Sequence, residues 1–328
     1  MSPDVASAPD LLRLLSLPLF VWVAYRDIRT RRVPSRTWLP IGALAVVLLA
    51  WDALAAWEMG GLVWRVFSLR VAMSLLIVVP MAYGFYRLGA FGGADAKALF
   101  VLALLFPTFP TYIVLGTVFP LGVTPVGVFS LTILTNAVLV GAAYPFVLFA
   151  RNALSGHRGP IAFIATPVPW DEVEETHGRV VESREGFDRS GLDLDALRMY
   201  LRWRGTTLAD LREDAVTFRD PASIPTTPNP VGDGAVATDG GPRSDDGLRT
   251  DGGSSGDPWG AEAFLIDVGP AYGTTPERLR EGLDLLTERE VVWVSPGIPF
   301  LVPISLGLLV SLVYGNVLFS LLSALGLA

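Results

Sequence analysis

The chain has 328 residues, of which 51% are hydrophobic, and its net charge at pH 7 is −7. Its mean hydropathy of +0.47 is too high for a soluble domain of this length, so the composition indicates a membrane protein. The chain contains no cysteine. Disulfides, thiolate zinc sites and cysteine nucleophiles are therefore excluded.

Charge is distributed unevenly along the chain. Residues 171–290 hold 26 of the 32 acidic residues and 13 arginines, whereas residues 1–150 hold 6 acidic and 10 basic residues. Lys97 is the only lysine. An acidic polar part that is almost empty of lysine suggests a protein that works in strong salt, as in a halophile.

Six apolar stretches are long enough to be membrane-spanning helices of roughly 20 residues each. The expected spans are residues 11–25, 39–57, 66–85, 98–118, 127–149 and 300–327. Pro107 and Pro110 predict a kink or an early end in the fourth span. The fold class is therefore an all-α membrane protein, with five helices in residues 1–150 and a sixth in residues 293–328. No signal-peptide cleavage site is evident before the first span, which we expect to be a retained anchor.

The arginines predict how the spans are oriented. The loop after the first span holds five arginines and one acid, Asp27, and the loops after the third and fifth spans are also basic. The positive-inside rule places these loops in the cytoplasm and both termini outside. Asp52 and Glu58 then lie at the outer end of the second span, where we interpret them as solvated. Arg13 is interpreted as snorkelling to the same surface.

Residues 151–292 form a large, acidic cytoplasmic insertion between the fifth and sixth spans. Short helices are expected over residues 193–204 and 208–214, and a further helix opens at Thr274 and runs to about Arg289. Residues 220–257 are rich in Gly, Pro, Asp, Ser and Thr. Such a composition buries little apolar surface and predicts a disordered linker.

Two acidic residues, Asp27 and Asp95, fall at the cytoplasmic ends of predicted spans. Asp27 follows the first span and Asp95 precedes the fourth, and opposite chain directions bring both to one membrane face. Taken singly, Asp95 could cap its helix and Asp27 could pair with the arginines around it. Together, the two carboxyls could share one proton around a water molecule, as an aspartic peptidase requires.

Other membrane-protease chemistries lack their residues. The chain has no His-Glu-x-x-His zinc motif, and both histidines, His157 and His177, lie outside the spans, where neither could serve a rhomboid-like serine. Glu174 and Glu175 echo the glutamate motif of CAAX-type prenyl peptidases, but they lie in a polar stretch and we interpret them as coincidental. No metal and no cofactor is expected.

Three segments resemble those of the archaeal prepilin and preflagellin (prearchaellin) peptidases, which belong to the GxGD aspartic membrane peptidases. The segments are DIRTRRVP at 27–34, GGADAK at 92–97 and VWVSPGIPF at 292–300. The resemblance implies that Asp27 and Asp95 are the catalytic pair of a six-helix peptidase. It also implies substrates whose short basic leader is followed by an apolar helix. Ala94 replaces the usual glycine, and the cysteine-bearing zinc segment of bacterial relatives is missing, so methylation is not implied.

The second and third of these segments supply further candidate site residues. They are Gly92, Gly93, Lys97, Pro296, Gly297 and Pro299. The two adjacent glycines let the backbone bend before Asp95. The proline-rich stretch leaves main-chain groups that could hold an extended substrate by strand addition, or it could simply turn the chain into the last span. The acidic insertion could attract a basic leader, although strong salt would screen that attraction.

Two other functions remain open. In a transporter or proton relay, the aspartate pair would carry ions or protons, and this predicts inverted repeats and acids near the bilayer centre, neither of which is evident. In a membrane scaffold, the insertion would recruit a partner and substituting either aspartate would be harmless. Leader cleavage by the aspartate pair accounts for more of the motifs than either alternative.

Overall fold

The computed structural model describes residues 5–183, 186–188, 191–236, 256–297 and 299–327. It divides into two compact units, one formed by Met1–Tyr144 with Ile298–Ala328 and the other by Pro145–Gly297. The second unit thus includes residues 145–150 and 293–297, which the sequence had assigned to the membrane domain.

Within the described residues, four helices are long and apolar enough to cross a membrane: Ala8–Thr30, Ser35–Met59, Gly61–Arg87 and Phe129–Leu154. They correspond to the first, second, third and fifth expected spans and indicate a membrane protein. The first comprises α1 (Ala8–Arg13) and α2 (Ser16–Thr30), and the second η1 (Ser35–Thr37) and α3 (Trp38–Met59). The third comprises α4 (Gly61–Met73), the π-helical η2 (Ser74–Val78) and α5 (Val79–Arg87), and the fourth is α7 (Phe129–Leu154).

The fourth expected span is replaced by a shorter helix. The helix α6 (Gly93–Leu105) ends before Pro107, and Phe106 has a non-helical φ of −128° and ψ of 55°. The residue directly before a proline is disfavoured in the helical conformation. The predicted early end is therefore confirmed, whereas the predicted extent of the helix, residues 98–118, is wrong. The following residues form a hairpin of β1 (Tyr112–Val114) and β2 (Thr117–Phe119) instead.

The last expected span is divided in two. The helix α13 (Leu301–Tyr314) ends at Gly315, whose φ of 78° and ψ of −140° interrupt the helix. A second helix, α14 (Val317–Ala324), begins after Asn316, which caps it by accepting the Phe319 N–H at 2.8 Å. At 1.5 Å per residue, α6 and α13 are each roughly 20 Å long, shorter than a hydrocarbon core of about 30 Å. The six-helix layout is thus not confirmed: among the described residues, four helices are long enough to span a membrane, and the shorter α6, α13 and α14 replace the other two expected spans.

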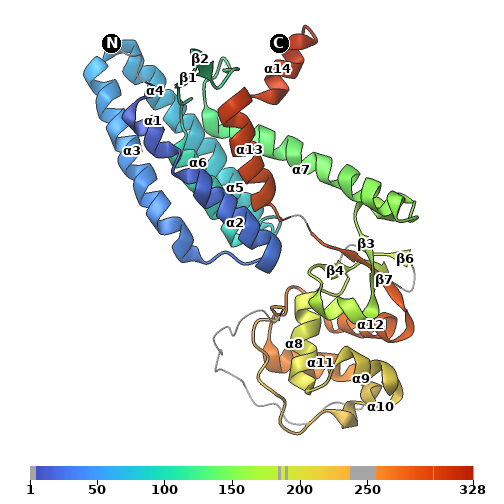
Figure 1. The fold of residues 1–328 in the computed structure, drawn as a ribbon. Coiled ribbons are helices and arrows are strands. Elements are labelled where there is room, and N and C mark those ends of the chain that lie inside the picture. The colour runs from blue at the N-terminus through green and yellow to red at the C-terminus, as the bar shows by residue number, and fades with distance from the viewer. Residues whose placement is uncertain (1–4, 184–185, 189–190, 237–255, 298, 328) are drawn as a thin grey trace. The chain divides into compact units, whose positions relative to one another are not determined.

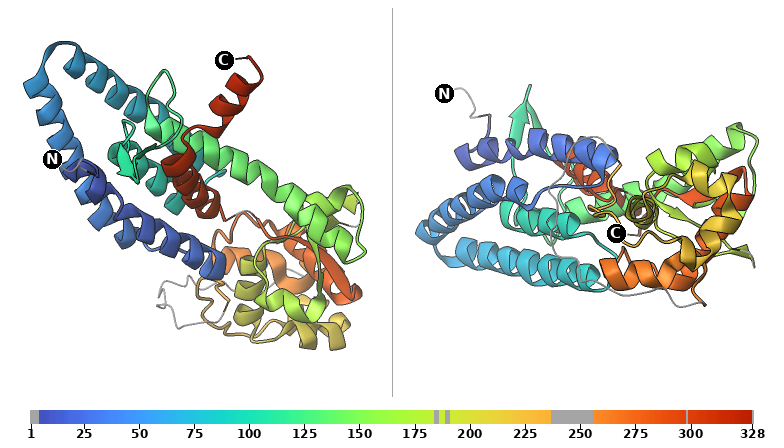
Figure 2. Two further views of the ribbon diagram at one scale, coloured as in Figure 1. Left: turned by 45° about the horizontal axis from the view of Figure 1, so that its top comes forward. Right: turned by 90° about the horizontal axis from the view of Figure 1, so that it is seen from below.

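The two short helices lie inside the first unit. The helix α6 packs against α3, α5 and α13, and α13 packs against α2 (Figure 2). The apolar side chains of Leu99, Leu102 and Leu105 on α6 are buried in this core. By contrast, large side chains such as Leu54 and Leu62 on the long helices are exposed, which is the distribution expected of lipid-facing surface.

The second unit contains a small antiparallel sheet that an all-α class does not include. Its strand order is β3 (Thr166–Pro169), β7 (Val291–Ser295) and β4 (Arg179–Val180) (Figure 1). Val292 and Val294 of β7 point into the core, as the period-2 alternation of a strand requires. A separate hairpin pairs β5 (Glu182–Ser183) with β6 (Gly186–Phe187).

Helices pack against this sheet, and the side chains of both form one hydrophobic core. They are α8 (Leu194–Arg204), α9 (Leu208–Glu213), α10 (Ala215–Arg219), α11 (Ala261–Val268) and α12 (Pro276–Glu288), with 3-10 turns η3 (Pro160–Phe163), η4 (Trp170–Glu175), η5 (Pro221–Ser223) and η6 (Pro258–Gly260). Asp193, Thr207 and Thr275 cap α8, α9 and α12 at their N-termini. The helices α8 and α9 lie where helices were expected, and Thr207 is the predicted cap of α9, whereas α12 is capped by Thr275 and not by the expected Thr274.

The stretch expected to be a disordered linker has hydrogen bonds where the structure describes it. Asn229 donates its main-chain N–H to Trp203, and Arg198 donates to the Gly234 carbonyl at 2.6 Å. Tyr272 donates its hydroxyl to the Asp233 carbonyl at 2.7 Å. Residues 220–236 therefore form part of the second unit, whereas residues 237–255 lie outside the described residues.

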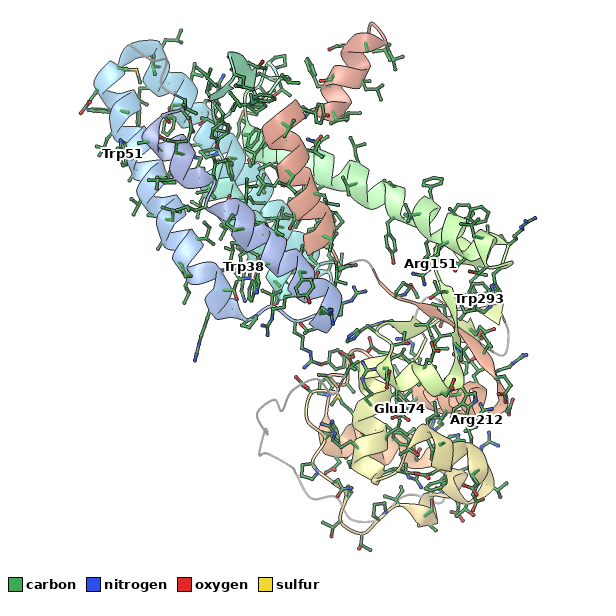
Figure 3. All side chains as sticks on the ribbon, viewed as in Figure 1. Trp38, Trp51, Arg151, Glu174, Arg212 and Trp293 are labelled. Atoms are coloured by element: carbon green, nitrogen blue, oxygen red, sulfur yellow. The ribbon has the colours of Figure 1, made fainter. Side chains whose placement is uncertain are left out.

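Glu174 has a structural contact that explains its presence. Its carboxylate accepts the Leu208 N–H at 2.9 Å, at the start of α9. Glu174 and Arg212 both belong to the second unit (Figure 3). The Arg212 guanidinium lies 4.5 Å from the centre of the Trp170 ring. The cap and the cation–π contact hold α9 in the second unit, and Glu174 lies outside the four candidate spans.

Candidate active site

Asp27 lies in the last turn of α2, and its residue is only 8% exposed. Its carboxylate accepts a hydrogen bond from the main-chain N–H of Leu301, the first residue of α13. Arg31 ends α2 in the left-handed conformation, with φ of 55°, and interacts electrostatically with Asp27. Because a buried carboxylate is costly unless it is hydrogen-bonded, the start of α13 is what makes this position tenable.

Asp95 is the third residue of α6 and is half-buried. Its Oδ2 accepts the Gly92 N–H at 2.9 Å, which closes the first turn of the helix. The N-terminal position favours a negative charge there. Asp95 thus accepts a main-chain N–H at the start of its helix, as expected if it caps α6. It does so from the third position of the helix, and the N-cap residue itself is Gly92.

The two carboxyls interact with each other. Asp95 lies outside the four candidate spans. Burial raises the pKa of Asp95 to about 6, the Gly92 hydrogen bond opposes this rise, and the Asp27 charge adds to it. The repulsion requires the carboxyls to lie within electrostatic range, although Asp27 and Asp95 are far apart in sequence. A carboxyl with such a pKa can hold or release a proton near neutral pH, which general acid–base catalysis requires.

Gly92 and Gly93 differ in how closely they approach other groups. A Cβ on Gly92 would lie 3.2 Å from Asp95 Oδ2, which is tight, so the glycine leaves room for the carboxylate. A Cβ on Gly93 would lie 3.6 Å from Tyr86, an ordinary contact. Only Gly92 therefore has a steric reason to be glycine at this turn.

Lys97 joins α6 to the η1 turn that precedes α3. Its Nζ donates to the Ser35 hydroxyl at 2.6 Å, and Ser35 lies in the η1 turn that follows the loop after α2. The contact fastens the loop that follows Asp27 to the helix that begins with the GGAD motif. Ser35 was not singled out from the sequence.

Aromatic rings join the GGAD turn to the start of α13. Phe91 and Phe300 stack with ring centres 4.5 Å apart and planes inclined by 28°, and Phe85 lies 5.0 Å from Phe91. Such pairs contribute beyond their buried area. Phe91 is next to Gly92, and Phe300 precedes Leu301. The stack thus connects the turn before Asp95 to the N–H that binds Asp27. Phe300 ends one motif segment and Phe91 directly precedes another, but only the structure pairs the two rings.

The remaining proline and glycine candidates lie in the part of the chain that passes from the second unit to the first. Gly297 has φ of 62°, in the left-handed region that glycine favours. Pro296 and Gly297 belong to the second unit, whereas the Pro299 carbonyl accepts the Val302 N–H at 2.9 Å in the first. Their expected role in holding an extended substrate stays a prediction.

Substituting Asp27 by asparagine is expected to lower the pKa of Asp95 below about 6. The Asp27 charge raises the pKa of Asp95, so removing that charge should let Asp95 lose its proton at lower pH. The measurement is an infrared titration of the carboxyl band that Asp95→Asn abolishes. An Asp95 titration that is the same with and without Asp27 would mean that the two carboxyls do not interact.

Two parts of the chain match models of known protein families. Residues 14–146, which include both aspartates, match the model of the type IV leader peptidase family, and residues 265–317 match that of the archaeal peptidase A24 C-terminus, type II. The second match includes α12, β7 and α13, so the last part of the insertion is a family feature. The chain is 26% identical over 136 residues to a preflagellin peptidase of Methanococcus maripaludis, spanning 40% of this chain and 55% of that relative. Over these two segments the chain is therefore similar to the type IV leader peptidases, and to those of archaea in particular.

Proposed function

We propose that this protein hydrolyses the peptide bond after the leader of preflagellin or prepilin substrates, and that Asp27 and Asp95 are its catalytic carboxyls. The family and the name of the archaeal relative support leader cleavage. The mechanism is supported by the hydrogen bonds that hold Asp27 at the start of α13 and Asp95 at the start of α6, and by the Asp27 charge, which raises the pKa of Asp95.

The two carboxyls would divide the chemistry of hydrolysis between them. The ionised carboxylate takes a proton from water, and the resulting hydroxide adds to the scissile carbonyl carbon. The protonated carboxyl donates a hydrogen bond to the carbonyl oxygen. When the C–N bond breaks, one carboxyl of the pair gives a proton to the leaving amine. The carbonyl carbon is left as the carboxylic acid of the released leader's new C-terminus. The proton count balances with one shared proton on the pair before and after the cycle.

The position of the pair suits a substrate whose cut lies at a membrane boundary. Asp27 lies at the end of the span Ala8–Thr30, and Asp95 precedes the apolar part of α6. A basic leader stays in the cytoplasm while the following apolar helix inserts, so its junction lies at that depth. The proposed orientation has the Asp27 and Asp95 ends of the helices facing the cytoplasm, with both termini outside.

The test is cleavage of a preflagellin-type substrate by membranes that contain the intact protein, at high salt. The expected product has the mass of the substrate without its leader. A second substrate, with the basic leader residues replaced by glutamine, should be cut more slowly because its leader is no longer held in the cytoplasm. If intact protein at confirmed expression leaves several preflagellin and prepilin substrates uncut, leader cleavage is not its function.

A further inference from the structure

A buried ionic cluster lies at the opposite end of α6 from Asp95. The Arg13 side chain, at the end of α1, is only 3% exposed, which corrects the expectation that it snorkels to the surface. Its Nη1 donates to Asp10 at 2.6 Å, and its Nη2 pairs with Asp52 of α3, which is therefore not simply solvated. Around this pair, Asp10 also accepts the Thr111 N–H at 3.2 Å.

The third donor of Arg13 binds α6 itself. Its Nε donates to the carbonyl oxygen of Leu105 at 2.7 Å, and Leu105 is the last residue of α6. The final carbonyls of a helix have no partner within the helix, so this bond satisfies a group that would otherwise be buried without one. One guanidinium thus connects α1, α3 and the C-terminus of α6.

The same two segments carry the two candidate catalytic carboxyls at their other ends. Arg13 and Asp27 lie on one candidate span, Ala8–Thr30, and are separated by roughly 20 Å of helix. Leu105 and Asp95 lie on α6, separated by roughly 15 Å. The segments run antiparallel, so their far ends meet at Arg13 and Leu105, and their near ends at the aspartates.

We infer that Arg13 is a positioning residue which fixes the axial register between the first span and α6, and thereby the relative placement of Asp27 and Asp95. Sliding the first span along α6 would break the Arg13 bond to Leu105, and sliding it along α3 would break the ion pair with Asp52. Because the cluster is buried and its geometry uses three acceptors on three elements, Arg13 holds one register rather than a range. This inference rests on the proposed function for its effect on cleavage, but not for its effect on the spacing of the carboxyls.

Three variants distinguish a change in the register of the helices from a general loss of stability. Arg13→Gln removes the charge and at least one of the three bonds, while Arg13→Lys keeps a charge but not the planar fork that serves three acceptors. Arg70→Gln is the matched control, because Arg70 also donates to a main-chain carbonyl, that of Val126 at 3.3 Å, but not to α6.

Two readouts test the inference on each folded variant, as full-length protein in membranes. In Arg13→Gln, kcat for leader cleavage should fall by roughly 10²-fold with KM little changed, as expected of displaced catalytic groups. The infrared titration of Asp95 should shift toward that of Asp27→Asn, since the carboxyls separate. Arg13→Lys should shift both readouts in the same direction by less, and Arg70→Gln should match the intact protein.

The contradicting results are distinct from failure of the proposed function. If folded Arg13→Gln keeps the intact kcat and the intact Asp95 titration, Arg13 does not set the register. If Arg13→Gln does not fold, the test rests on Arg13→Lys. The inference is overturned if Arg13→Lys has the same kcat and the same Asp95 titration as the intact protein. If the intact protein cleaves no leader, the proposed function fails, and the titration alone still decides whether Arg13 spaces the carboxyls.

Discussion

Replacing Asp27 or Asp95 by asparagine is expected to reduce leader cleavage by roughly 10²–10⁴-fold or more, the range by which general acid–base groups accelerate reactions. Asparagine has nearly the same shape as aspartate and can keep accepting the Leu301 or Gly92 N–H, so folding should be preserved. It can neither take a proton from water nor share one. Either substitution alone should be sufficient, because the proposed chemistry uses both carboxyls at once.

The assay measures the mass of the product at matched expression, with Glu58→Gln as the control. Glu58 is an exposed acid near the end of α3 and should be replaceable without effect. If a folded Asp27→Asn or Asp95→Asn variant cleaved at the intact rate, the carboxyl pair would not be catalytic. The relay and scaffold functions would then account better for the chain.

Substituting Gly307 by alanine is expected to destabilise the first unit by about 1–3 kcal/mol, the typical cost of overpacking, and to slow cleavage. A Cβ at Gly307 would lie 2.6 Å from the Ala137 nitrogen and 2.9 Å from its Cα. Main chain cannot move aside as a flexible side chain can, so α13 must move away from α7. Leu301, at the start of α13, would then be displaced from Asp27.

The same interface supplies the control for Gly307. A Cβ on Gly141 of α7 would meet Pro303 of α13 at 3.8 Å, an ordinary contact. Gly141→Ala should therefore be neutral or slightly stabilising, since alanine favours a helix more than glycine does. The measurements are the thermal unfolding midpoint and the cleavage rate of both variants. Equal stability and activity for Gly307→Ala and the intact protein would mean that α7 and α13 do not pack this closely.

Local signals predicted the parts of the fold that depend on nearby residues. Apolar stretches located the four long helices, and the capping residue Thr207 located α9, while α12 begins one residue later than the Thr274 signal predicted. Pro107 predicted that the fourth span would end early. The sheet was not predicted, because β3 and β4 are short and pair with β7, which lies more than a hundred residues away in sequence. Such pairing leaves no pattern within a short window.

The candidate site also has parts that could be predicted from the sequence and parts that could not. Asp27 and Asp95 could be singled out because ionisable residues at membrane boundaries are rare, and because the motifs around them resemble those of one family. The partners of Asp27 could not, since Leu301 contributes only its main-chain N–H, which any residue but proline could supply. Arg13 was assigned to the surface because a single arginine near a span end usually reaches water. Its partners on α3 and α6 become adjacent only when the helices pack.

The most direct test of paired-carboxyl catalysis is the affinity of a substrate peptide whose scissile amide is replaced by a hydroxyl-bearing isostere of the tetrahedral intermediate. A paired-carboxyl site should bind this peptide at least 10²-fold more tightly than the matching methylene isostere, as transition-state analogues generally do. That preference should disappear in Asp27→Asn and Asp95→Asn. Equal affinity of the intact protein for the two isosteres would contradict the assignment of Asp27 and Asp95 as the groups that activate water.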